Sequence, residues 1–141
     1  MKSLLTLFII AFSSLPLAAQ LSTLNIHSIS VNHNQEQKAV QSTIEKELAL
    51  DRPVDITIFE DGKMQIIGTF EYARSGNRIK LVTFLRLIHQ GNMIKSKKKK
   101  YVQFIKESVP RELSGVFADN YFIDKASLNA VDLRFKFNFN Y

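Results

Sequence analysis

The 141-residue chain contains no cysteine, which excludes disulfide bonds, a lipidated N-terminal cysteine and thiolate metal sites. Small secreted proteins of eukaryotes usually depend on disulfides, whereas proteins of a bacterial periplasm or cell surface often do without them. If the chain is exported, its composition therefore favours a periplasmic or surface location in a bacterium.

Catalytic and cofactor signatures are also missing. His27, His33 and His89 are scattered, and none has a metal-ligand spacing to another histidine or carboxylate on one predicted element. Asp55 and Glu71 fall on the outer face of adjacent predicted strands, but nothing nearby indicates a pocket, so we interpret them as exposed hairpin charges. The sequence predicts no catalytic residue, metal or cofactor, and favours a non-enzymatic domain over an enzyme.

Residues 1–19 show the three regions of a secretory signal peptide. A charged residue follows the initial methionine, an apolar run covers residues 4–12, and small residues precede Ala19. The apolar run is too short to cross a bilayer comfortably, and no second long run exists. We expect cleavage before Gln20 and a single domain over residues 20–141. The alternative is a buried N-terminal helix.

The clearest organisation lies in residues 53–90, where apolar and polar residues alternate with a period of two. This pattern predicts three antiparallel strands joined by two short turns. The second turn is expected within residues 75–77, and either central pair there keeps Phe70 and Leu85 on one apolar face. Gly68 lies in the middle of that face and would leave a gap. We expect a helix crossing the sheet to fill it.

The first turn of this meander contains Asp61 and Gly62. A two-residue turn would mix the faces of its strands, because a shift of one residue reverses every side chain. A three-residue loop beginning at Glu60, with Gly62 at positive φ, instead pairs Ile58 with Met64 and gives one apolar face. We predict this register.

The N-terminal part of the mature chain predicts a strand followed by a helix. Residues 21–31 indicate a strand with a bulge, because the alternation slips after Ile26. From Val40 to Leu48 apolar residues recur every fourth position, with charged residues on the other face. With a capping-box pattern at Asn34 and Gln37, this spacing predicts an amphipathic helix of about four turns, over residues 35–50, that ends before Pro53.

The C-terminal part predicts further strands. Residues 131–141 alternate most regularly of all, and such a strand must pair along its length to avoid aggregation. Residues 93–106 are interpreted as an edge strand, and Pro110 as the start of a short helix limited by Gly115. Together the elements predict an α+β fold: a curved antiparallel sheet, made of the meander and a C-terminal return strand, with one amphipathic helix packed on a face.

Acidic residues are absent between Tyr72 and Lys106, where ten basic residues occur with Lys106 included. Residues 34–71 have eight acids against four bases. A one-sided positive field attracts polyanions, which in a cell envelope are lipid phosphates, lipopolysaccharide or acidic polysaccharides. Nucleic acid is not expected, because the chain looks exported and has no aromatic stacking motif. The residues predicted to bind an anionic envelope partner are Arg74, Arg78, Lys80, Arg86, Lys95, Lys97, Lys98, Lys99 and Lys100.

Three functions therefore stay open, and the first is favoured. It is an exported, non-enzymatic domain that binds an anionic or apolar envelope partner. The second is a small outer-membrane β-barrel or barrel-associated protein, because the alternating strand that ends in Tyr141 resembles the last strand of such barrels. The third is a small hydrolase without a local signature. For residues 97–100, the alternative to binding is a solvated loop that guards a sheet edge.

Overall fold

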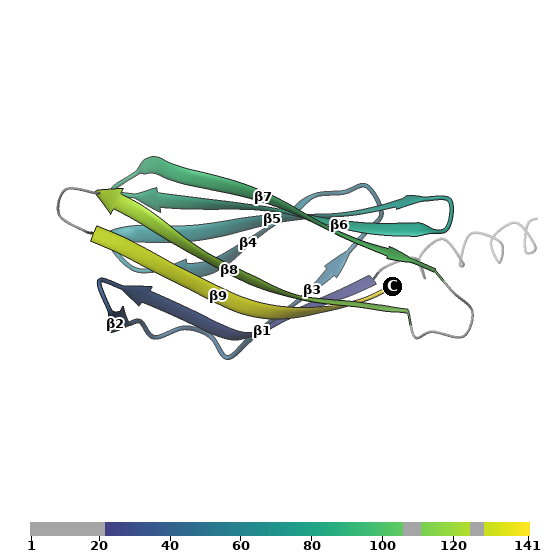
Figure 1. Cartoon of the computed structure of the whole chain (residues 1–141), viewed down its shortest axis with the longest axis horizontal. Helices are drawn as coiled ribbons and strands as arrows, with labels where there is room; N and C mark the ends of the chain where they lie inside the picture. Colours follow the sequence, from purple (N-terminus) through teal and green to yellow (C-terminus); the bar gives the residue numbers. More distant parts are fainter. Residues whose placement is uncertain (1–21, 106–110, 125–128) are drawn as a thin grey trace, which may run out of the picture.

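The computed structural model describes residues 22–105, 111–124 and 129–141, and all nine of its regular elements there are β-strands (Figure 1). The predicted α+β class is therefore wrong, because no helix occurs in the described residues. The strands are β1 (Ser22–His33), β2 (Glu36–Gln37), β3 (Thr43–Leu48), β4 (Val54–Glu60), β5 (Met64–Ser75), β6 (Arg78–His89), β7 (Asn92–Phe104), β8 (Glu112–Asp124) and β9 (Asn129–Asn140).

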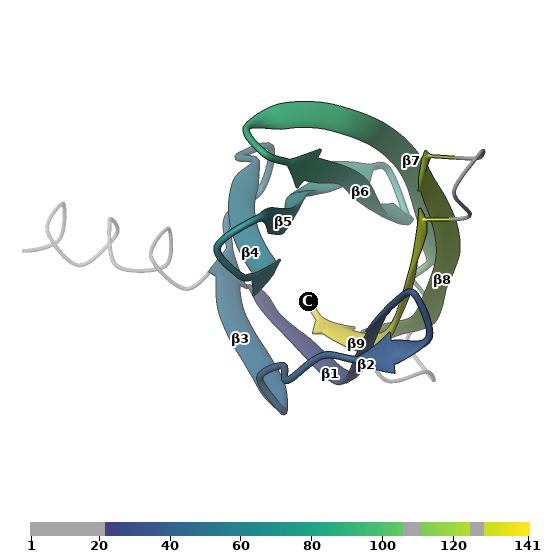
Figure 2. The same cartoon turned by 90° about the vertical axis from the view of Figure 1, so that its left-hand side faces the viewer.

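The strands form two antiparallel sheets. One sheet has the order β2-β1-β9-β8, with β3 also paired to β1, and the other has the order β4-β5-β6-β7. Figure 2 shows the strands surrounding a common interior. Alternate side chains fill that interior, which is typical of antiparallel sheets with one buried face. The largest of the fully buried side chains are Phe70, Phe117, Tyr121, Phe135, Phe137 and Phe139.

The helix predicted over residues 35–50 is wrong. Thr43–Leu48 form β3, which pairs antiparallel with β1. Ile44 and Leu48 are buried, whereas Lys46 between them is exposed. A spacing of four residues fits one helical turn and also two strand periods, so the pattern was compatible with both structures. Lys46 thus occupies a position that strand alternation directs inward. A charged residue at such a position of an edge strand commonly prevents the strand from pairing with another chain.

The predicted bulge in the first strand is confirmed. The pairing of β1 with β9 shifts between His27 and Ser30, and Ser28 has a φ of 53°. The predicted pairing of the C-terminal strand along its length is also confirmed, because β9 lies between β1 and β8. β9 is therefore an interior strand of its sheet.

The predicted meander is confirmed as β4, β5 and β6, but the predicted register of its first turn is wrong. Ile56 lies opposite Gly68 rather than Ile66, and the pairing shifts between Thr57 and Phe59. A bulge of one extra residue in β4, rather than a positive φ at Gly62, thus keeps the apolar side chains on one face. Ile56, Ile58, Met64 and Ile66 are all buried.

Asp61, not Gly62, shapes this turn. The Asp61 carboxylate accepts hydrogen bonds from the backbone N–H of Lys63 at 2.8 Å and of Met64 at 2.7 Å. The bond from Lys63, followed by that from Met64, outweighs partial burial and lowers the pKa of Asp61. The backbone N–H of Asp61 in turn donates to the Met64 carbonyl at 2.9 Å. Aspartate often closes a turn in this way.

The second turn has Gly76 and Asn77 as its central pair, and Gly76 has a φ of +60°. Gly76→Ala is therefore expected to lower the free energy of unfolding by about 1 kcal/mol, because a Cβ disfavours this conformation. Gly62→Ala is the control, since Gly62 has no positive φ and no atom within 4 Å of an added Cβ. Urea denaturation measures both variants. Equal midpoints for the two would contradict the observed turns.

No helix is needed to fill the space at Gly68. A Cβ there would lie 2.6 Å from Cε2 of Phe70 and 3.0 Å from Cδ2 of Leu85, so these two side chains already occupy the gap. Gly115 in β8 is covered in the same way, since an added Cβ would lie 2.6 Å from the ring of Phe137. Aromatic rings over glycines thus close the interior of both sheets.

The strand predicted over residues 93–106 is confirmed as β7, the last strand of the four-stranded sheet. The short helix predicted from Pro110 is wrong where it can be compared, because Glu112–Asp124 form β8. Pro110 itself and the predicted signal segment, residues 1–19, lie outside the described residues. In the part of the chain that is described, no helix is long and apolar enough to cross a membrane.

Candidate functional site

Strand alternation divides the predicted basic residues between two faces of β7. In the lysine run, Lys98 and Lys100 are exposed, whereas Lys97 and Lys99 are half-buried. The half-buried pair lies on the same face as Tyr101 and points toward β8 of the other sheet, as their contacts show. The four consecutive lysines therefore lie in two environments: Lys98 and Lys100 face outward, and Lys97 and Lys99 face β8.

The inward side chains of β7 close one side of the molecule. Nζ of Lys97 lies 3.1 Å from Oδ2 of Asp119, and Nζ of Lys99 lies 5.1 Å from the centroid of the Phe117 ring. The Tyr101 ring meets the Phe137 ring edge-on, with centroids 4.7 Å apart. β7 and β8 belong to different sheets, so these side-chain contacts link the two. We refer to Lys97, Lys99 and Tyr101 with their β8 and β9 partners as the β7–β8 seam.

Burial affects the two tyrosines on this side of the interior. It raises the pKa of the Tyr101 phenol. Burial also raises the pKa of Tyr121, and the negative charge of Asp119 adds to that effect. Asp119 is only 17% exposed, so its ion pair with Lys97 compensates a carboxylate that is largely removed from water. In the β7–β8 seam, the charges of Lys97 and Asp119 thus serve the packing of the two sheets.

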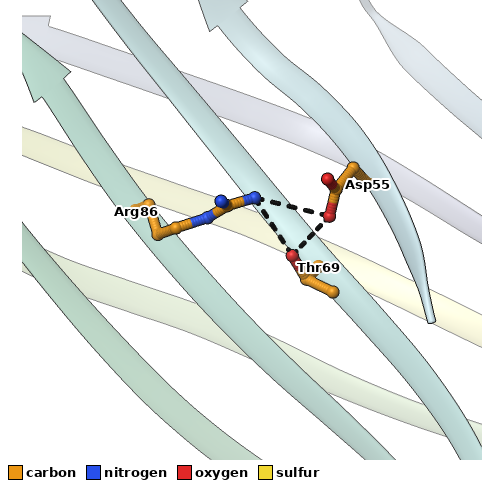
Figure 3. A network of polar contacts seen from close by, with 3 residues as sticks. All are labelled: Asp55, Thr69 and Arg86. Atoms are coloured by element: carbon orange, nitrogen blue, oxygen red, sulfur yellow. Dashed lines mark hydrogen bonds and ion pairs between the residues drawn. The ribbon is translucent and has the colours of Figure 1, made fainter. Parts of the chain in front are cut away.

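Arg86 is engaged by a polar network on the outer face of β4, β5 and β6 (Figure 3). Its Nη2 donates to Thr69 Oγ1 at 3.2 Å and lies 3.4 Å from Asp55 Oδ1. The Thr69 hydroxyl donates to the same Asp55 oxygen at 2.5 Å. Asp55 is therefore an ion-pair partner of Arg86. The positive charge of Arg86 is partly neutralised by this pair, which makes Arg86 the weakest of the predicted anion ligands on this face.

Five of the predicted residues remain available to a partner. They have no ion-pair partner among the described residues. They lie on β6, on β7 and at the end of β5, in the four-stranded sheet. Lys95 is placed in β7 opposite Leu87. The five available residues are Arg74, Arg78, Lys80, Lys98 and Lys100.

Apolar residues alternate on the outer face with four of these cations, Arg78, Lys80, Lys98 and Lys100, whereas Arg74 lies opposite the buried Ile79. Across the β6–β7 ladder the pairs are Arg78 with Phe104, Lys80 with Val102, Val82 with Lys100, and Phe84 with Lys98. Each pair thus joins one cation to one apolar side chain. We call these eight residues the β6–β7 outer face.

Exposure makes this face unusual for a water-facing sheet. Val102 is 44% exposed and Phe104 is 55% exposed. Cζ of Arg78 lies 5.9 Å from the centroid of the Phe104 ring, within the range of a cation–π contact. These apolar members were not predicted from the sequence, although they share the parity of the cations across the ladder and could have been found from it.

No group of three His, Asp or Glu side chains in the described ranges is close enough to hold a metal ion. No protein-family model, curated protein or solved structure matches the chain. The geometry of the β6–β7 outer face is therefore the main basis for a functional argument.

Proposed function

We propose that this protein is an exported, non-enzymatic domain of a bacterial periplasm or cell surface, and that its β6–β7 outer face binds an anionic component of the envelope. One observation carries the proposal: cations without an ion-pair partner in the described structure share one face with exposed apolar side chains. The export step depends on the signal peptide predicted for residues 1–19.

The mixture of charge and apolar surface favours an amphiphile over a purely polar polyanion. Lipid phosphates and lipopolysaccharide combine negative charge with hydrocarbon, and basic residues beside apolar ones suit the boundary between headgroups and acyl chains. An acidic polysaccharide would use the cations but leave Val102 and Phe104 in water. We therefore favour a lipid surface as the partner.

Peripheral binding fits the surface better than insertion of the strands. Strands that cross a membrane present an apolar band to lipid. The outward side chains in the middle of β9 are instead Asp132, Arg134 and Lys136, and all three are exposed. This distribution supports contact through one face of a folded domain.

Vesicle binding tests the proposal. The mature chain is expected to co-sediment with vesicles that contain phosphatidylglycerol, but not with vesicles of phosphatidylcholine alone. Binding should fall steeply between about 0.01 M and about 1 M salt, because the screening length falls from about 30 Å to about 3 Å over this range. Absence of binding to anionic vesicles at the lowest salt would show that the lysines only protect a sheet edge.

A further inference from the structure

The outer face contains a depression of about 320 Å³ at the end where the β5–β6 turn lies. Strand register explains the lining residues other than Arg74, which lies between two outward rows and opposite the buried Ile79. Ala73, Lys80 and Val102 form one row across β5, β6 and β7, and the next row begins with Ser75 and Arg78. The short side chains of Ala73 and Ser75 provide a floor beside much longer neighbours. Its lining residues are Ala73, Arg74, Ser75, Arg78, Lys80 and Val102.

Of the three described cations at this depression, two are held by contacts of their own. Nε of Arg74 donates to the carbonyl of Gly76 at 3.2 Å, and the Arg78 guanidinium lies against the Phe104 ring. The turn is also anchored, since the N–H of Ile105 donates to the carbonyl of Asn77 at 2.7 Å. A ligand would therefore meet arginines that have already lost part of their freedom, which lowers the entropy cost of binding.

Among the described residues, no acid lines the depression. Glu71, the nearest outward acid along β5, lies opposite Val82 and thus one row beyond Lys80. Three positive charges in one small site favour a group that carries more than one negative charge. Guanidinium groups match phosphate oxygens with paired N–H donors, and a terminal phosphate offers three such oxygens.

We propose that this depression is a specific subsite for the phosphomonoester group of a membrane lipid. The subsite deepens the proposed function and rests on it. Phe104 and Val102 beside the cations point to a phosphate carried by a lipid, since a phosphate compound in solution would gain nothing from them. The rest of the β6–β7 outer face supplies attraction that does not distinguish one anionic lipid from another.

The test measures the affinity of the mature chain for two types of vesicle. Phosphatidic acid carries a phosphomonoester, whereas phosphatidylglycerol carries a phosphodiester, and the two preparations are matched for surface potential. Affinity is expected to be about tenfold higher for phosphatidic acid, the order of one added charge-assisted hydrogen bond. Equal affinity at matched potential would overturn the subsite and leave the proposed function intact. Binding to neither preparation would overturn both.

Three variants test whether the depression causes the preference for phosphatidic acid. Ala73→Leu fills the floor without changing charge, and Arg74→Gln/Arg78→Gln removes the two guanidinium groups. Both are expected to abolish the preference for phosphatidic acid while salt-dependent binding persists. Lys98→Gln/Lys100→Gln removes the same charge outside the depression, and should weaken binding to both lipids but keep their ratio. A preference that survives in Ala73→Leu and Arg74→Gln/Arg78→Gln would place the monoester elsewhere and overturn the proposal.

The source of the phosphate is tested with glycerol phosphate in solution. We expect it to compete only weakly, because it lacks the apolar part of the ligand. Tight binding of glycerol phosphate by a chain that shows no preference between the vesicles would overturn the lipid source.

Discussion

Replacing Phe137 with alanine is expected to lower the free energy of unfolding by about 3–5 kcal/mol, the range for deleting a fully buried aromatic side chain. The Phe137 side chain is 1% exposed and lies in β9, an interior strand of its sheet. It packs edge-on against Tyr101 of the opposite sheet and covers Gly115 of β8. Its loss therefore opens a cavity at the point where both sheets meet. Chemical denaturation measures the change.

Phe122→Ala provides the control for this prediction. Phe122 lies in β8, next to β9, but is 43% exposed. Its truncation is expected to cost less than about 1 kcal/mol, as is usual for surface positions. If Phe137→Ala were no more destabilising than Phe122→Ala, the packing of the two sheets on each other would be wrong.

Two double variants of the lysine run are expected to separate binding from stability. Lys98→Gln/Lys100→Gln should weaken binding to anionic vesicles by about thirtyfold, because each basic residue at such a surface contributes about 1 kcal/mol. Its unfolding midpoint should be unchanged, since neither lysine has an ion-pair partner in the described structure. Vesicle titration and denaturation are measured on the same preparations.

Lys97→Gln/Lys99→Gln removes the same charge from the same run, but from the β7–β8 seam. This variant should lose about 1 kcal/mol of stability, because it leaves the largely buried Asp119 without its ion pair. Its vesicle affinity should fall much less than that of the outward pair. Equal loss of affinity in both variants would mean that binding depends on net charge alone, without a defined face.

The strands of the meander and the C-terminal strand were predictable from the sequence, because a period of two has no helical interpretation when it continues over many residues. β3 was not, because only two of its side chains are buried and their spacing fits a helix equally well. The bulge in β4 was also missed. The bulge is defined by the pairing of β4 with β5, and this pairing cannot be read from the alternation of residues within one strand.

The candidate site was predicted only in part. Charge counting identified the basic stretch, but it could not separate Lys98, which faces outward, from Lys97, which faces Asp119. That ion pair joins residues far apart in the sequence, on strands of different sheets. The same limit applies to Arg86, whose partner Asp55 is reached across β5. Partners of this kind follow from sheet order, which the sequence pattern did not determine.

Lysine labelling with and without anionic vesicles tests whether the β6–β7 outer face is the contact surface, because each molecule contains its own controls. Lys80, Lys98 and Lys100 belong to the β6–β7 outer face, whereas Lys46 and Lys136 are exposed on the other sheet. We expect an amine-reactive reagent, read out by mass spectrometry, to label the first three more slowly when vesicles are present and the other two at an unchanged rate. Equal protection of all five lysines, or protection of Lys46 and Lys136 alone, would contradict this expectation.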